Sequence, residues 1–216
     1  RVMDKTDVSV ILVNTQIGDS YSSEVVENVI TNLCEQLVIS RKKYHLFILS
    51  STVMPGEIRG KFIPMIEKLT NRELNRGFGF SYVPDIVKLG SVIDDFENPD
   101  VVIIGGSDSR SISTTHNLYK TIPVNDPPTC RMTLEEAEIA KVTLNAYLVN
   151  KISFANFLSN ICDSSENLNV DNITNAIGYH KPIGHSFLKG GLGFGGTCFP
   201  RDTKAFIDFT RKLGLG

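Results

Sequence analysis

The residues best suited to chemistry lie near the end of the chain, in the sequence GGTCFPRD at residues 195–202. Pro200 follows Cys198 closely, and proline favours the first turn of a helix, so a helix is expected directly after the cysteine. A thiol at a helix N-terminus, with Arg201 and Lys204 close by, has its thiolate favoured by positive charge and becomes more nucleophilic. The alternative is a buried, inert cysteine, the commonest fate of an intracellular thiol.

Two polar side chains on a long apolar stretch could support such a nucleophile. Lys141 and Asn145 are four residues apart, so on a helix they lie on the same face. Together they would direct an ammonium and an amide donor at an oxygen that gains negative charge, as alkoxide and thiohemiacetal chemistry requires. Asp202, four residues after Cys198, could hold a water or a neighbouring ammonium. A solvated polar stripe is the alternative for the Lys141 and Asn145 pair.

Glycines beside the cysteine match the letters of a dinucleotide-binding turn but not its context. Gly191, Gly193 and Gly196 satisfy G-x-G-x-x-G. However, no strand is expected before them, no βαβ unit follows, and no acidic residue stands about 20 positions further on. We therefore interpret the pattern as a false match.

The composition excludes several classes of protein. With 22 basic against 24 acidic residues, no block of like charge suggests a nucleic-acid-binding face. The four cysteines are far apart and form no C-x-x-C pair, which argues against a disulfide framework and predicts no metal site. No apolar run approaches the ~20 residues that span a bilayer, and the N-terminus lacks the apolar core of a signal peptide. We expect a cytoplasmic protein that binds neither nucleic acid nor membrane.

The first half of the sequence alternates apolar strands with amphipathic helices. Strands are expected at residues 8–13, 46–49, 80–83 and 101–104, and helices at residues 23–40 and 56–69. This order predicts an α/β fold with a partial doubly wound, parallel, Rossmann-like sheet and right-handed crossovers. Ligands bind at the carboxyl ends of such strands. The residues there are Asn14, Thr15, Ser51 and Thr52. The same residue types are also ordinary strand-exit and helix-cap residues.

After a proline-rich stretch at residues 122–128 the pattern becomes helical. Thr133 and Glu136 have the spacing of a capping box, and apolar residues at helical spacing continue to about Asn167. Such a helix would be roughly 50 Å long. Because its apolar residues occupy more than one face, we expect helix 133–167 to form a homodimer interface.

A shorter helix is expected over residues 171–177, ending at Gly178. The change of pattern predicts two domains. Residues 1–128 would be the C-terminal part of a Rossmann-like domain, and residues 129–216 a mainly helical domain that carries one long central helix and the cysteine loop.

Five stretches of the chain, taken in order, resemble the UDP-glucose/GDP-mannose dehydrogenase family. They are LVNT at residues 12–15, STV at 51–53, GSVIDDFENP at 90–99, the EIAK, Asn145 and KISF positions within 138–154, and residues 187–202. The resemblance implies two successive NAD-dependent oxidations of the C6 hydroxyl of a nucleotide sugar, which give a uronic acid for polysaccharide biosynthesis. UDP-glucose is the expected substrate, because GGTCFPRD resembles that branch of the family.

The resemblance also implies roles for individual residues. Cys198 would capture the intermediate aldehyde as a thiohemiacetal, which is oxidised to a thioester and hydrolysed. Lys141 would stabilise oxyanions, Asn145 and Asp202 would position the reacting oxygen or water, and Asp85 would be a further catalytic carboxylate. The positions implied for NAD binding, of which Thr52 is also catalytic, are Asn14, Thr15, Ser51, Thr52 and Arg201. Those implied for the sugar nucleotide are Lys141, Asn145, Phe187, Leu188, Lys189, Gly191 and Gly195.

The chain departs from the family's pattern at several positions. The family's PEFLxEG segment is PDIVKLG at residues 84–90, so Asp85 replaces one glutamate and Leu89 the other. Pro182 stands where the family often has an arginine, and Arg201 stands where lysine is usual. A UDP-N-acetylhexosamine or GDP-mannose dehydrogenase is therefore an alternative. Leu89 favours an alternative of another class, a non-catalytic dimerisation module.

Two parts of the family's sequence do not occur within residues 1–216. The G-x-G-x-x-G turn that opens the family's NAD domain would precede Arg1, and the C-terminal nucleotide-binding domain would follow Gly216. We accordingly expect a central fragment of a longer enzyme. By itself this fragment is expected not to complete an NAD site and to be inactive.

Overall fold

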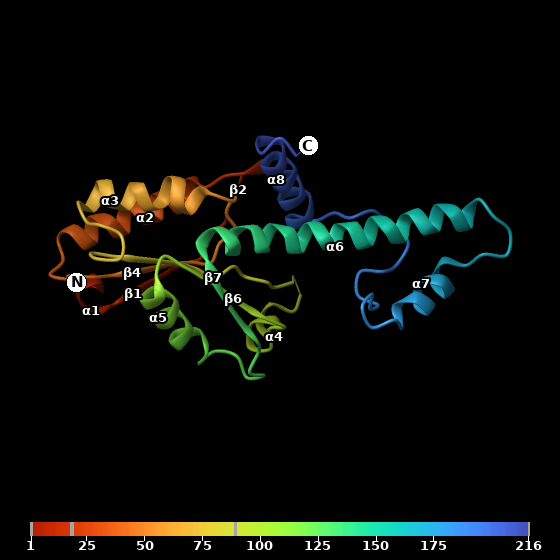
Figure 1. Cartoon of the computed structure of the whole chain (residues 1–216), viewed down its shortest axis with the longest axis horizontal. Helices are drawn as coiled ribbons and strands as arrows, with labels where there is room; N and C mark the ends of the chain where they lie inside the picture. The colour runs from red at the N-terminus through yellow and green to blue at the C-terminus, as the bar shows by residue number, and fades with distance from the viewer. Residues whose placement is uncertain (1, 18–19, 89, 216) are drawn as a thin grey trace. The chain divides into compact units, whose positions relative to one another are not determined.

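The computed structural model of the chain describes residues 2–17, 20–88 and 90–215 (Figure 1). It divides into two compact units, Arg1–Lys141 and Val142–Gly216, and the boundary falls inside the long helix α6 (Leu134–Asp163). Among the described residues, no helix combines the length and the apolar character that crossing a bilayer requires.

The first unit is built on a five-stranded sheet in the order β1-β4-β5-β6-β7. The strands are β1 (Val8–Ile11), β4 (Leu46–Leu49), β5 (Gly79–Tyr82), β6 (Val102–Gly106) and β7 (Thr129–Thr133). Strands β1, β4 and β5 are mutually parallel, as are β6 and β7. A separate antiparallel pair joins β2 (Gln16–Ile17) to β3 (Ser20–Tyr21). The expected α/β, Rossmann-like fold class is confirmed.

One pairing differs from the parallel arrangement predicted for the sheet, because β6 runs antiparallel to β5. In the described part of the connection between these strands, the one helix is α4 (Val92–Glu97), which has six residues and no buried side chain. A parallel neighbour requires a crossover, usually a helix packed across the sheet. Since α4 is too short and too exposed for that task, the chain returns in the opposite direction.

Helices cover both faces of this sheet (Figure 1). One face carries α2 (Glu24–Val38), the π-helical turn η1 (Ile58–Phe62) and α3 (Ile63–Thr70), and the other carries α5 (Ser109–Tyr119). Both faces need cover because β4 has apolar side chains on each of them. Phe47 and Leu49 belong to the larger of two apolar core clusters, and Leu46 and Ile48 belong to the smaller. A short helix, α1 (Val2–Lys5), precedes β1. The helices predicted at residues 23–40 and 56–69 are thus present as α2 and as η1 with α3.

Helix α6 begins at the predicted capping box. The Glu136 carboxylate accepts hydrogen bonds from the Thr133 amide and hydroxyl, and the Glu136 amide donates to Thr133 Oγ1 at 3.2 Å. The helix ends at Asp163, four residues before the predicted end, and Asn167 beyond it has a left-handed φ of 62°. The second unit continues with α7 (Val170–Gly178) and α8 (Cys198–Lys212).

Candidate active site

The loops after β1 and β4 are joined by Ser51. Its hydroxyl donates to the carbonyl oxygen of Val13 and accepts from the Val13 amide, both at 2.7 Å. The Ser51 hydroxyl therefore donates one hydrogen bond and accepts another, both within the protein. Asn14 closes a local turn with Gln16, while Thr15 is buried and Thr52 is partly exposed. The residues predicted for cofactor binding lie at the carboxyl edge of the strands, where parallel sheets hold ligands.

Lys141 lies against the loop that follows β5. It is 7% exposed, and its ammonium donates a hydrogen bond of 2.6 Å to the backbone carbonyl of Asp85. Burial raises the pKa of the Asp85 carboxyl to about 6, although the positive charge of Lys141 acts in the opposite direction. The structure thus brings together two of the predicted catalytic residues. A carboxyl with a pKa near neutrality can serve as a general base.

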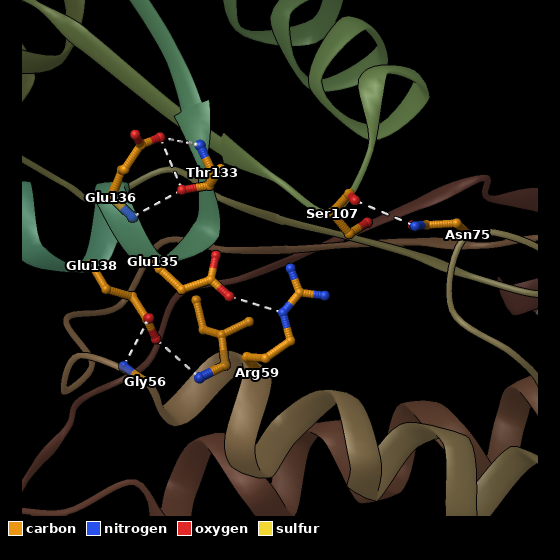
Figure 2. A network of polar contacts seen from close by, with 9 residues as sticks. Gly56, Arg59, Asn75, Ser107, Thr133, Glu135, Glu136 and Glu138 are labelled. Carbon is orange, nitrogen blue, oxygen red and sulfur yellow. Dashed lines mark hydrogen bonds and ion pairs between the residues drawn. The ribbon is translucent and has the colours of Figure 1, made fainter.

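Glu138, one turn before Lys141 on α6, is fully buried and was given no role by the sequence analysis. Its two carboxylate oxygens accept hydrogen bonds of 2.9 Å from the amides of Gly56 and Ile58. Figure 2 shows Glu138 beside Gly56. Burial raises its pKa to about 7, against the lowering effect of these two hydrogen bonds. The sequence did hold one signal for Glu138. It is a carboxylate in an apolar helical stretch, three residues before Lys141, and so lies one helical turn from it.

In the second unit, α8 begins at Cys198 itself. The cysteine therefore lies at a helix N-terminus, as predicted. Its side chain is exposed, unlike that of a buried, inert cysteine. Thr197 Oγ1 lies 3.6 Å from the sulfur. The first-turn amides and the helix dipole favour negative charge at this position.

Asp202, on the first turns of α8, is fully buried and held from two sides. One carboxylate oxygen accepts from Asn145 Nδ2 at 2.6 Å and the other from Arg201 Nε at 2.7 Å. The Arg201 side chain, 10% exposed, is thereby engaged with Asp202 rather than free beside the sulfur. Lys204, also expected near the thiol, is exposed.

Replacing Asp202 by asparagine should lower the free energy of unfolding by about 3 kcal/mol, because it leaves the buried Arg201 without its counter-charge. The matched control is Asp208→Asn, which removes an exposed partner of Arg211 on the same helix and should change stability by less than about 0.5 kcal/mol. Urea unfolding of the chain measures both. Equal effects of the two substitutions would show that Asp202 does not stabilise the chain as the counter-charge of Arg201.

The loop predicted to carry the sugar nucleotide is fastened to α6 by one side chain. Asn156 accepts from the Gly191 amide at 2.9 Å and donates to the Leu192 carbonyl at 3.3 Å. Phe187 lies edge-on to Phe199 with ring centroids 6.0 Å apart, and Leu188 is buried. Of the other predicted positions, Lys189, Gly191 and Gly195 are exposed.

The predicted catalytic residues form two groups, one in each unit. The first unit holds Thr52, Asp85 and Lys141, and the second holds Asn145, Cys198 and Asp202. Of the sequence departures, Pro182 is exposed and Leu89 lies outside the described residues. Each group combines a carboxylate with a nitrogen donor, a combination suited to moving protons at a reacting oxygen.

Comparison with known proteins gives matches along nearly the whole chain. Residues 1–123 match the family model described as the NAD binding domain of the UDP-glucose/GDP-mannose dehydrogenase family, and residues 135–216 match the central domain of the same family. The curated UDP-glucose 6-dehydrogenase AglM of Haloferax volcanii is 32% identical over 97% of this chain and 49% of its own length.

Solved structures agree with these matches. A UDP-glucose dehydrogenase from Pyrobaculum islandicum superimposes with a TM-score of 0.87 and 32% identity, over 99% of this chain and 48% of that one. A GDP-mannose dehydrogenase from Pseudomonas aeruginosa superimposes with a TM-score of 0.76 and 26% identity, over 100% of this chain and 49% of that one. The chain therefore spans about half the length of these relatives.

Proposed function

Because the chain belongs to the UDP-glucose/GDP-mannose dehydrogenase family, we propose that it carries the catalytic residues of a nucleotide-sugar 6-dehydrogenase. The reaction is the oxidation of UDP-glucose to UDP-glucuronate in two steps through a covalent intermediate on Cys198. The observation that carries this proposal is the exposed thiol at the first residue of α8, one turn before the buried carboxylate of Asp202.

NAD is the cofactor, since residues 1–123 match the family's NAD-binding domain. The carboxyl edge of β1 and β4 fits part of such a site, because it offers the hydroxyl of Thr52 on a loop that Ser51 fixes. Asn14 and Thr15 would contribute from the loop after β1. When bound, NAD supplies a hydride acceptor for each oxidation.

Cys198 is the proposed nucleophile. It lies at the first residue of α8, where the helix dipole can stabilise negative charge that develops during the reaction. The thiolate would add to the C6 aldehyde produced by the first oxidation and give a thiohemiacetal. Oxidation of that adduct gives a thioester, which water cleaves to the carboxylate and the free thiol.

The other residues would handle charge and protons. Lys141 and Asn145 would donate to the oxygen that becomes negative as each bond to C6 forms. Asp85, with a pKa of about 6, would be mostly ionised at neutral pH and could take a proton from the alcohol or from water. Asp202 would orient Asn145, to which it is already bonded.

We also propose a homodimer through α6. Four large apolar side chains of this helix are 41–63% exposed, which is costly for a helix that stays in water. They are Tyr147, Phe154, Phe157 and Ile161. A second copy of the helix would cover them, as closed twofold assemblies commonly do.

A panel of sugar nucleotides tests the proposed function. The protein as encoded, with any sequence that flanks residues 1–216, is incubated with NAD and UDP-glucose, GDP-mannose or a UDP-N-acetylhexosamine. We expect UDP-glucuronate with two molecules of NADH for each sugar, and slower turnover of the others. If another member of the panel reacted faster, that sugar nucleotide would take the place of UDP-glucose as the proposed substrate. If no member were oxidised, the proposed dehydrogenase function would be refuted.

A further inference from the structure

The buried carboxylate of Glu138 has no part in the chemistry proposed above, yet it reaches the loop that carries Thr52. Glu138 belongs to α6, and its partners lie at the beginning of η1. Gly56 precedes it by 82 residues and Ile58 by 80 residues. The amides at a helix start have no partner within the helix, so an acceptor from elsewhere must satisfy them. Glu138 supplies that acceptor from a second element.

This contact fixes one end of the segment 51–58, which we call the Thr52 loop. The other end is fixed by Ser51, whose hydroxyl holds Val13. Between the two anchors, Val53 is buried and Thr52 is partly exposed. The Thr52 loop is therefore attached at both ends, to the loop after β1 and to α6.

The same turn of α6 also holds the loop after β5. Lys141, three residues after Glu138, donates its ammonium hydrogen bond to the Asp85 carbonyl. Glu138 and Lys141 thus attach the loops of two neighbouring parallel strands, β4 and β5, to one rigid helical turn. A displacement of the Glu138 contact would move Thr52 relative to both Lys141 and Asp85.

We propose that Glu138 is a positioning residue, which holds the Thr52 loop in register with the Lys141 ammonium for catalysis. The inference rests on the proposed function and adds a residue to which that function assigned no role. Two properties of the carboxylate suit the task. It offers an acceptor oxygen to each of two amides, and it is fully buried, so water does not compete for them.

Glutamine in place of Glu138 gives the sharpest test, because it keeps the shape of the side chain but has one acceptor oxygen in place of two. Its amide group would face one of the two backbone donors. In the protein as encoded, Glu138→Gln should lower kcat about tenfold and Glu138→Ala about 100-fold, the scale of a misplaced catalytic group. The KM for the nucleotide sugar should stay within about twofold, because six of the seven positions implied for sugar binding, all except Lys141, lie in the other unit.

The matched control is Glu135→Gln. Glu135 lies one turn earlier on α6 and also bonds to η1, through Arg59 Nε at 2.9 Å, but its side chain is 44% exposed (Figure 2). Exposed ion pairs contribute little, so this variant should keep kcat within about twofold. Hydrogen–deuterium exchange on the same proteins gives a readout independent of activity. Exchange at residues 51–58 should accelerate in Glu138→Gln and not in Glu135→Gln, while β4 and α3 stay protected.

The outcomes separate the two proposals. Unchanged kcat in Glu138→Gln, or an equal loss in Glu135→Gln, would overturn the positioning role while leaving the dehydrogenase intact. Faster exchange throughout the sheet, or failure of the variant to fold, would also overturn it, by showing that Glu138 supports the whole unit. A wild-type protein that oxidises no nucleotide sugar would refute the proposed function itself, and the positioning role with it.

Discussion

Cys198→Ser is expected to reduce uronate formation by about 10³-fold or more, the scale of losing a nucleophile. A serine hydroxyl at this position would be far less acidic than the thiol and would not form the thioester that the proposed second oxidation requires. Product analysis by chromatography, with NAD and UDP-glucose supplied to the protein as encoded, measures the loss.

The fold should survive this substitution, because the Cys198 side chain is exposed and packs against no core cluster. The thermal midpoint should therefore stay within about 2 °C of the wild-type value. Cys130→Ser is the matched control, since Cys130 is also a free, exposed cysteine. Undiminished uronate formation by Cys198→Ser would show that Cys198 is not the nucleophile, whatever the control shows.

Lys141→Ala is expected to lower turnover by more than about 10²-fold, the scale of losing one oxyanion donor. The ammonium is buried and close to the Asp85 carboxyl, whose pKa depends on it. Steady-state kinetics on the protein as encoded give kcat and KM separately, and the loss should fall on kcat.

Lys151→Ala provides the comparison for this result. Lys151 lies on the same helix and its ammonium also donates to a backbone carbonyl, that of Ile183 at 2.9 Å, but it belongs to no proposed catalytic group. Its removal should change kcat by less than about threefold. A tenfold loss or less in Lys141→Ala would mean that the Lys141 ammonium only attaches the Asp85 loop to α6.

The elements with strong local patterns could be predicted from the sequence. Strand β4 is LFIL, four apolar residues that are all buried, and the Thr133 and Glu136 pair marks the start of α6. Helix α5 was missed because its buried face is polar, with Thr115 bonded to Ser81 at 2.8 Å. Strand β7 was missed although TCRMT alternates polar and apolar residues, because it directly follows the proline-rich stretch and three of its five residues are exposed.

The sequence indicates which residue types a candidate site would use, but not which of them pair with one another. The spacing of Cys198 and Asp202 follows from one helix, whereas Asn145 meets Asp202 across 57 positions, a contact that only the tertiary fold creates. Glu138 is the clearest example. A carboxylate in an apolar helical stretch does not reveal, without the fold, which backbone amides it will reach.

The proposed reaction requires a covalent bond between the substrate and Cys198, and mass spectrometry of the acid-quenched reaction can detect this bond. The protein as encoded is mixed with UDP-glucose and NAD, quenched within the first turnovers and digested. We expect the peptide containing Cys198 to gain the mass of the UDP-sugar thioester, and the peptide containing Cys130 to keep its mass. Continued formation of uronate with no adduct on Cys198 at any time point would show that Cys198 is not the nucleophile.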